Sequence, residues 1–247
     1  MTATEKTETC PLEVRGVSVS FGGLQALTDV SIRAERGKLT ALIGPNGAGK
    51  STLLNAISGF IPPKSGAVLL NGQQQRRRPP WSRVRQGMAR TFQDVEIFDG
   101  MTAFENLVVA GPDRQTAHTE ATRLLEEVEL SQVADDSGTS LSYGEQKMVG
   151  IARLLATGGD VLLFDEPGAG LSRDSVDSIG RLLRGLTERD RTVVLVEHNM
   201  HLVFTYADYV YVLHHGTVVA EGTPAEIQRH PEVLRVYLTG AGTEGES

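Results

Sequence analysis

The stretch LTALIGPNGAGKSTLLNAIS constrains the fold of this chain more than any other segment. An apolar run, Leu39–Ile43, leads directly into a glycine-rich loop, and helix-forming residues follow up to Gly59. The loop Gly44–Ser51 matches the pattern GxxxxGK[ST], in which backbone N–H groups wrap around phosphate oxygens because glycine has no Cβ to obstruct them. We therefore predict a strand, a phosphate-binding P-loop and a helix, the central unit of an α/β nucleotide-binding core sheet.

Each position of this loop has an expected role in holding a nucleotide. Lys50 brings positive charge to the β- and γ-phosphates, and Ser51 offers a hydroxyl to Mg²⁺. An ordinary glycine-rich turn is the alternative, but the flanking strand and helix favour the P-loop. The expected cofactors are ATP and Mg²⁺, and the expected nucleotide contacts in this loop are Gly44, Pro45, Asn46, Gly47, Ala48, Gly49, Lys50, Ser51 and Thr52.

A second apolar run, VLLFDE, delivers two carboxylates at the end of a predicted buried strand. Ligands of open α/β sheets bind at that end of the strands. We expect Asp165 to hold Mg²⁺ through a water molecule. Pro167 favours an extended backbone at Glu166, so the two neighbouring carboxylates should point apart. Glu166 is then the candidate to polarise an attacking water, although two surface acids remain the alternative.

Three further side chains are candidates for the same site. Gln93, in RTFQ, carries a neutral amide that can bind both the metal and the water. His198 follows the apolar strand that ends LVEH, where its imidazole can bind the γ-phosphate. Phe21 ends an early strand and is a candidate to stack on adenine. Taken alone, Gln93 or His198 could equally be a surface residue or a satisfied core group, and Phe21 a core aromatic.

The stretch LSYGEQKMVGIAR reads as a capped helix start and raises a question. A helix start that carries Ser142 and Gly144 can bind an anion through its free backbone N–H groups. This second phosphate site would lie about a hundred residues after the P-loop. The residues alone do not explain why one chain needs two such sites.

The remaining pattern places the elements around this core. Val17–Phe21 and Val30–Ala34 alternate and predict half-buried antiparallel strands, and Tyr209–Leu213 with Thr217–Gly222 predict a hairpin. Thr223 is the expected N-cap of the last helix, with Pro224 first and Glu226 closing a capping box.

The domain boundaries follow from the termini. Residues 1–11 and 239–247 are polar or small and lack periodicity, so we predict them to be disordered. One domain, 12–238, remains, with helical spacing from Thr119 to Leu130 inside a small helical subdomain at about 94–155.

Charge and composition narrow the class of partner. A net charge of -7 argues against a general nucleic-acid binder. A single cysteine fits a reducing compartment. Since no apolar run reaches the ~18 residues of a membrane span, we expect a cytoplasmic chain. The exception to the overall negative charge is a local arginine cluster: Arg76, Arg77, Arg78, Arg83, Arg85 and Arg90. We predict that these arginines lie in a solvated loop, and the alternative is contact with a partner or with anionic lipid.

In their order along the chain, GPNGAGKST, Gln93, LSYGEQ, VLLFDE and His198 resemble the ATP-binding subunit of an ABC transporter, from about Leu12 to Leu238. The resemblance implies the ABC ATPase fold, with an antiparallel β subdomain and a small α-helical subdomain. It also implies that a second ATPase subunit packs head to tail, so that Ser142, Gly144 and Glu145 contact the nucleotide of the partner. This would answer why there are two phosphate sites.

The same resemblance implies further partners. Integral-membrane permease subunits would dock near Gln93–Glu105, and a substrate-binding protein would act indirectly. The chain would lie peripherally on the inner face of the cell membrane, held there by the permease chains.

Three stretches are similar to the importers of leucine, isoleucine and valine: GMARTFQDVEIFDGMTAFENLVVAG, LSYGEQ and the C-terminal run from VEHNM to YLTG. ATP-driven uptake of branched-chain amino acids is therefore the expected function. The alternatives are import of urea or short amides and export of a lipid or lipopolysaccharide. More distant alternatives are a soluble ABC switch protein of DNA repair or translation and a stand-alone P-loop kinase or GTPase.

Two features depart from the family pattern. The section between Gln93 and Leu141 is short, which implies a trimmed helical subdomain. Ser172 stands where many members carry an aspartate that helps the two ATP sites communicate, so the resemblance does not carry that coupling over to this chain.

Overall fold

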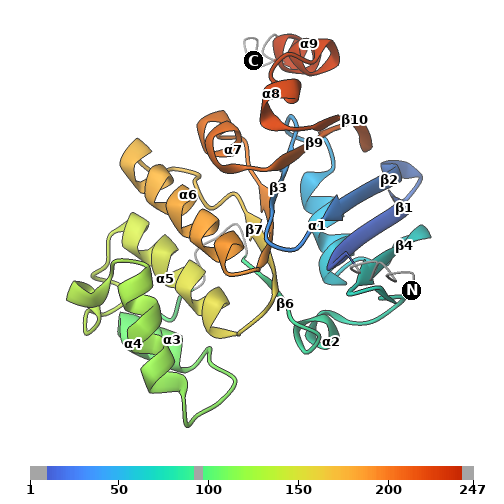
Figure 1. Cartoon of the computed structure of the whole chain (residues 1–247). Helices are drawn as coiled ribbons and strands as arrows, with labels where there is room; N and C mark the ends of the chain where they lie inside the picture. Colours follow the sequence, from blue (N-terminus) through green and yellow to red (C-terminus); the bar gives the residue numbers. More distant parts are fainter. Residues whose placement is uncertain (1–9, 92–96, 241–247) are drawn as a thin grey trace, which may run out of the picture.

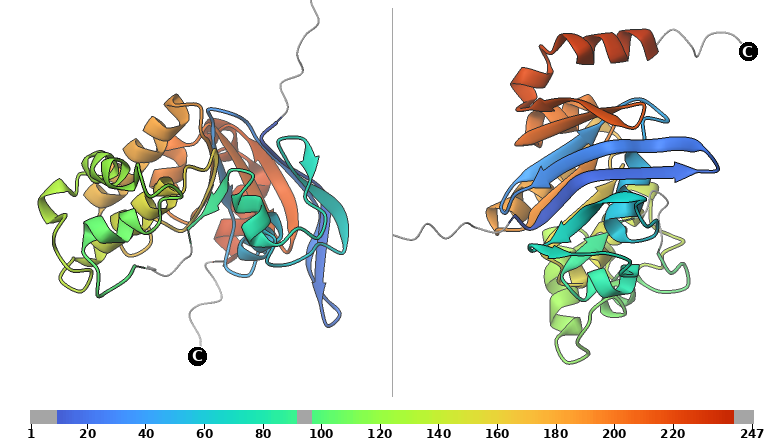
Figure 2. Two further views of the ribbon diagram at one scale, coloured as in Figure 1. Left: turned by 90° about the horizontal axis from the view of Figure 1, so that it is seen from below. Right: turned by 90° about the vertical axis from the view of Figure 1, so that its right-hand side faces the viewer.

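The computed structural model describes residues 10–91 and 97–240. Figure 1 shows a mainly parallel sheet in the middle, an antiparallel sheet on one side of it and a group of helices on the other. Figure 2 shows the same arrangement from two further sides, with the C-terminal helix α9 standing above the sheets in the right-hand view. The predicted α/β core with an antiparallel and a helical subdomain is confirmed.

The core sheet has the strand order β10-β9-β3-β8-β7-β6, and all its pairs are parallel except β9 with β10. Every residue of β3, β7 and β8 is buried, which explains why these strands read as continuous apolar runs. Their carboxyl ends meet at one edge of the sheet. The strands are β3 (Leu39–Ile43), β6 (Met88–Arg90), β7 (Val161–Asp165), β8 (Thr192–Val196), β9 (Tyr209–His214) and β10 (Thr217–Gly222).

The antiparallel sheet has the order β2-β1-β4-β5, and the predicted antiparallel pairing of the first two strands is confirmed. Its inner face packs on helix α1 and through it on the core sheet, where Leu27, Leu53 and Val194 belong to one fully buried cluster. The elements are β1 (Leu12–Phe21), β2 (Leu24–Ala34), α1 (Lys50–Ser58), β4 (Ser65–Leu70) and β5 (Gln73–Gln74). As predicted, α1 ends at Gly59, which takes the left-handed conformation of a helix cap.

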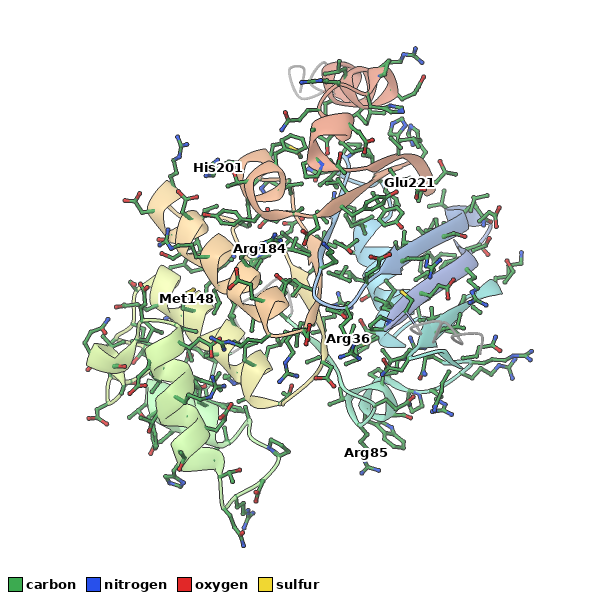
Figure 3. All side chains as sticks on the ribbon, in the orientation of Figure 1. Arg36, Arg85, Met148, Arg184, His201 and Glu221 are labelled. Carbon is green, nitrogen blue, oxygen red and sulfur yellow. The ribbon has the colours of Figure 1, made fainter. Side chains whose placement is uncertain are left out.

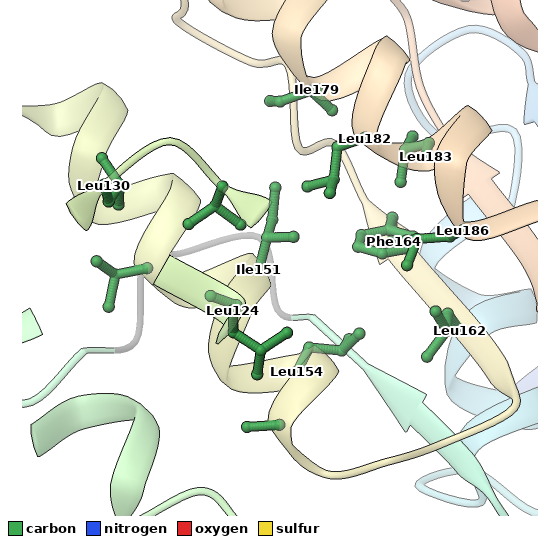
Figure 4. Packing of buried hydrophobic residues seen from close by; sticks show 14 of the residues in the cluster. Leu124, Leu130, Ile151, Leu154, Leu162, Phe164, Ile179, Leu182, Leu183 and Leu186 are labelled. Carbon is green, nitrogen blue, oxygen red and sulfur yellow. The ribbon is translucent and has the colours of Figure 1, made fainter. Parts of the chain in front are cut away.

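The helical section lies between β6 and β7 in the chain. Figure 4 shows its core, where Leu124 and Ile151 face Phe164 of the sheet and Ile179 of α6, so one apolar cluster joins this section to the core. The elements of this section are α3 (Ala103–Val108), α4 (Ala117–Glu127), the short 3₁₀ helix η1 (Ser131–Val133) and α5 (Tyr143–Ala156). Helix α6 (Arg173–Glu188) follows β7 in the chain and packs on the same cluster.

The arginine cluster surrounds α2 (Pro80–Val84), and the prediction of a solvated loop is only partly right. Arg83 is buried, and its guanidinium donates to backbone carbonyls in the last turn of α1 and to the carbonyl of Gln75. The last carbonyls of a helix have few backbone partners, so a side-chain donor can cap them. Arg90 is also largely buried. Four members are exposed, and Figure 3 shows Arg85 at the lower edge: Arg76, Arg77, Arg78 and Arg85.

The C-terminal part contains α7 (Met200–Tyr206), α8 (Pro224–Ile227) and α9 (Pro231–Gly240). Thr223 caps α8 through the predicted capping box. One last helix was expected there, but the structure has two, and Pro231 opens the second. Helix α9 extends two residues past the expected domain end, and the predictions for residues 1–9 and 241–247 lie outside the described residues. Within 10–91 and 97–240, no helix combines the length and apolar character needed to cross a membrane.

Candidate nucleotide site

The glycine-rich loop connects β3 to α1 as predicted. Gly44 and Gly49 are required by space: a Cβ on Gly44 would overlap the carbonyl oxygen of Leu213, and one on Gly49 would lie 2.8 Å from a methyl carbon of Leu27. Helix α1 begins at Lys50, and no side chain among the described residues caps it. Its first backbone N–H groups can therefore serve an anion.

Lys50 is the charged group of this loop. Only 6% of it is exposed, and Nζ donates to the carbonyls of Gly44 at 2.7 Å and Pro45 at 3.0 Å. Burial lowers the pKa of Lys50, while Glu166 and Asp165 act in the opposite direction. The other predicted contacts differ in exposure: Asn46, Gly47 and Ser51 are exposed, Pro45, Gly49 and Thr52 are half-buried, and Gly44 and Ala48 are buried.

Asp165 ends β7 and forms a buried ion pair with Arg90, with 3.0 Å between Arg90 Nη2 and Asp165 Oδ2. Burial raises the pKa of Asp165, and the hydrogen bond from Arg90 lowers it in part. Arg90 also donates to Asn55 at 2.7 Å and Ser58 at 3.1 Å on α1. A solvated Arg90 was therefore the wrong expectation, because the pairing of β6 with β7 places this residue at the strand end that carries Asp165.

The backbone of Glu166 differs from the prediction. Its φ of 49° is left-handed rather than extended. The N–H of Glu166 donates to the carbonyl of Val196 at 2.9 Å, so pairing with β8 continues one residue past the strand, and the chain must then turn out of the sheet at Pro167. The carbonyl of Glu166 accepts from Lys147 Nζ at 3.3 Å. Such a backbone costs about 1–3 kcal/mol and persists where its surroundings determine it.

His198 approaches Glu166, as expected for residues that follow neighbouring parallel strands. The distance between His198 Nδ1 and Glu166 Oε2 is 3.6 Å, and the side chains are 59% and 18% exposed. The register that pairs Asp165 with Val196 brings these two loops to the same edge. An acid and an imidazole therefore lie beside the phosphate loop, which is a suitable arrangement for polarising water.

The predicted helix start at Ser142 is confirmed, and its cap is a reciprocal one. Ser142 Oγ accepts from the N–H of Glu145 at 3.4 Å, and Glu145 Oε2 accepts from the N–H of Ser142 at 2.8 Å. The hydrogen bonds from Ser142 lower the pKa of Glu145. Across the part of the chain that the structure describes, no hydrogen bond or ion pair joins this loop to Gly44–Thr52. One chain therefore presents two separate anion-binding features.

Two candidates remain predictions. Gln93 lies outside the described residues, so neither its catalytic nor its metal role is placed. Phe21 ends β1 with 48% of its surface exposed, which removes the core-aromatic alternative and leaves its ring available for stacking.

Three polar residues at this site make contacts that the sequence motifs did not predict. Arg90 holds Asp165, Lys147 of α5 binds the carbonyl of Glu166, and Glu197 is fully buried next to His198. Glu197 could have been suspected, because a carboxylate directly after the apolar run TVVLV needs a partner when buried. No pattern in the sequence singles out Lys147.

Comparison with known proteins gives consistent matches. The family described as "ABC transporter" matches residues 27–169, and the family described as "Branched-chain amino acid ATP-binding cassette transporter" matches residues 217–238. The high-affinity branched-chain amino acid transport ATP-binding protein BraF of Pseudomonas aeruginosa is 37% identical, over 92% of this chain and 97% of its own. Its counterpart LivG of Escherichia coli K12 is 36% identical with the same coverage.

Solved structures agree with these matches. A nucleotide-free ATP-binding cassette from an ABC transporter has a TM-score of 0.85 and 30% identity, over 92% of this chain and 98% of that one. A dimeric post-hydrolysis cassette bound to ADP and Pi has a TM-score of 0.76 and 25% identity, over 86% and 98%.

Proposed function

The chain belongs to the family of ABC transporter ATP-binding subunits, which hydrolyse ATP, and from this premise we propose that it powers the uptake of branched-chain amino acids. The observation that carries the substrate class is the match at residues 217–238, supported by two relatives named for branched-chain amino acid transport. This segment covers β10, α8 and part of α9 and contains none of the residues proposed to bind ATP. It therefore distinguishes among transporter groups rather than reporting on ATP chemistry.

In the proposed mechanism, the P-loop and the start of α1 bind the phosphates of ATP. The loop supplies backbone N–H groups, and Lys50 supplies an ammonium with three donors. Ser51 and Asp165 offer hydroxyl and carboxylate oxygens, a donor set that fits Mg²⁺. When bound there with ATP, the ion would neutralise phosphate charge.

Glu166 is the proposed general base and His198 its neighbour at the γ-phosphate. The carboxylate of Glu166 is only 18% exposed, so it can act on one positioned water with little competition from bulk solvent. Removal of a general base costs roughly 10²–10⁴-fold in rate. Glu166→Gln should therefore bind ATP and hydrolyse it slowly.

The proposed assembly is a head-to-tail pair of ATPase subunits, either two copies or two related chains. Ser142 and Gly144 would contact the nucleotide of the partner, which explains why the capped start of α5 has no contact with its own P-loop among the described residues. A relative that is dimeric when bound to ADP and Pi supports the pairing of two such subunits.

Permease subunits are the proposed membrane partners, so the chain would sit at the inner face of the cell membrane. Their candidate docking site is Gln93–Glu105, of which residues 97–105 are described. Phe98 is 48% exposed there, and the fully buried Asn106 binds both its N–H and its carbonyl. A fixed, exposed aromatic ring is a suitable anchor for a partner. A substrate-binding protein would act only through the permease.

The test of the substrate class is uptake of labelled leucine by the source cells after replacing the chromosomal copy with Lys50→Ala. The matched control is Lys64→Ala, an exposed lysine outside the P-loop. We expect high-affinity uptake to be lost only in Lys50→Ala. If leucine uptake persists while uptake of labelled urea is lost, the substrate class is wrong and the ATPase assignment stands.

The test of the assembly is gel filtration of Glu166→Gln with ATP. Slow hydrolysis should trap an ATP-bound dimer that Lys50→Ala does not form. A monomer at saturating ATP in Glu166→Gln, with confirmed ATP binding, would count against the proposed head-to-tail pair.

A further inference from the structure

Glu197 is a fully buried carboxylate that none of the roles above uses. It follows β8 directly, and none of its surface is exposed. Glutamate is almost never buried to this extent without partners. Its partners here are three backbone N–H groups: Oε1 accepts from Gly168 at 2.7 Å, and Oε2 accepts from His198 at 3.0 Å and from Asn199 at 3.0 Å. Both oxygens are therefore engaged, each with a different segment of the chain.

These two segments are the loops that carry the proposed catalytic pair. Gly168 comes two residues after Glu166, and His198 is itself one of the bound groups. One carboxylate thus ties the loop after β7 to the loop after β8, next to the point where Glu166 and His198 approach to 3.6 Å. The contact depends on glycine, because a Cβ on Gly168 would lie 2.8 Å from Glu197 Oε1.

Because His198 is exposed, the hydrogen bonds to Glu197 are important for the position of its side chain. With 59% of its side chain exposed, the imidazole has little packing to define its place. Its position must come from the backbone, which Glu197 binds at two successive N–H groups. Asn199 then caps α7 by accepting from the N–H of Leu202 at 3.2 Å, so the segment continues directly into a helix.

We propose that Glu197 is a positioning residue for ATP hydrolysis, which places the imidazole of His198 against Glu166 by anchoring the backbone at His198 to the loop of Gly168. It acts through His198 and does not touch the nucleotide, since none of its surface is accessible. The proposal rests on the function proposed above for Glu166 and His198. A purely structural carboxylate would change stability without a specific link to His198.

The test is a double-mutant cycle that measures kcat and KM for ATP in Glu197→Gln, His198→Ala and the double variant. The amide of the new glutamine cannot accept hydrogen bonds from both Gly168 and the backbone at His198, because its nitrogen is a donor. We expect Glu197→Gln to lower kcat by roughly 10–100-fold, the cost of a small misplacement, with KM changed less than about twofold. The double variant should match His198→Ala alone. Glu221→Gln, an exposed site on β10 labelled in Figure 3, is the matched control and should leave kcat unchanged.

The outcomes separate this proposal from the one on which it rests. If the losses in the double variant multiply, Glu197 does not act through His198, and the positioning role is overturned while the catalytic pair stands. If His198→Ala alone retains full kcat, the proposed role of His198 fails, and the positioning role fails with it.

A second variant covers the case in which Glu197→Gln does not fold. Gly168→Ala disturbs the same contact from the other side and leaves the carboxylate intact. We expect its kcat to fall in the wild-type background and to stay unchanged when His198→Ala is already present. An equal loss in both backgrounds would overturn the proposal.

Discussion

Replacing Arg90 by methionine should destabilise the protein far more than the loss of an ordinary ion pair. The side chains of Arg90 and Asp165 are only 9% and 6% exposed, and their nitrogen and oxygen lie 3.0 Å apart. Arg90→Met removes one charge and leaves the other buried without its partner. Breaking a buried pair in this way costs about 3–5 kcal/mol. For a domain of this size, that corresponds to a fall in melting temperature of about 6–20 °C.

The stability lost in Arg90→Met should depend on pH, and the direction of this dependence follows from the pKa of Asp165. Burial already raises the pKa of Asp165 above its ordinary value, and the hydrogen bond and charge of Arg90 oppose that rise. In Arg90→Met the pKa of Asp165 should rise further. An acid whose folded pKa is raised destabilises the native state above that pKa and stops doing so once protonated. The difference between variant and wild type should therefore be largest near pH 7.5 and shrink as the pH falls.

Urea denaturation followed by circular dichroism at several pH values measures this effect. Arg90→Met/Asp165→Asn should recover at least about half of the lost stability, because no unpaired charge remains. Arg235→Met is the matched control: its pair with Glu232 has side chains 68% and 48% exposed and should contribute about 0–1 kcal/mol. A loss below about 1 kcal/mol in Arg90→Met at pH 7.5 would refute the reasoning.

Three further perturbations test local packing and capping. Gly180→Ala should destabilise the protein by about 1–3 kcal/mol in urea denaturation, because its Cβ would overlap the ring of Tyr206. The control is Gly185→Ala on the same helix, whose Cβ would meet no atom within 4 Å and which should stabilise the protein by about 1 kcal/mol. Equal effects of the two substitutions would contradict the packing argument. Arg83→Met should lower the unfolding free energy by about 1–3 kcal/mol, since it removes the donor to the carbonyls that end α1, and an unchanged urea midpoint would count against this. Thr223→Ala should cost about 1 kcal/mol in thermal denaturation by deleting the cap of α8, and a serine there should restore it.

The parts of the fold that the sequence predicts well are those where one physical signal dominates. Strands β3, β7 and β8 are buried on both faces, so they appear as unbroken apolar runs. Helix α1 stops at Gly59, and α5 starts at Ser142, where local cap chemistry alone decides the boundary. The P-loop was predictable for the same reason, since the local backbone geometry of the loop requires its glycines.

The parts that the sequence does not predict depend on contacts between distant segments. Arg90 belongs to a basic cluster by composition, and only strand register shows that it reaches Asp165. Pro167 favours an extended Glu166, but the hydrogen bond to Val196 and the turn out of the sheet impose a left-handed one. Glu197 is similar, because its partner Gly168 lies 29 residues away in the chain.

The strand order of the core sheet has a consequence for synthesis on the ribosome. Strand β3, which leads into the P-loop, pairs with β8 and β9, so both of its neighbours come late in the chain. From Ile43 to Thr192 is 149 residues, which takes roughly 7–30 s to translate at ordinary speeds. Throughout that interval the nascent P-loop strand has no partner in its own sheet. A chain that terminates before β8 should therefore be a substrate for chaperones and proteases rather than a partial nucleotide-binding domain.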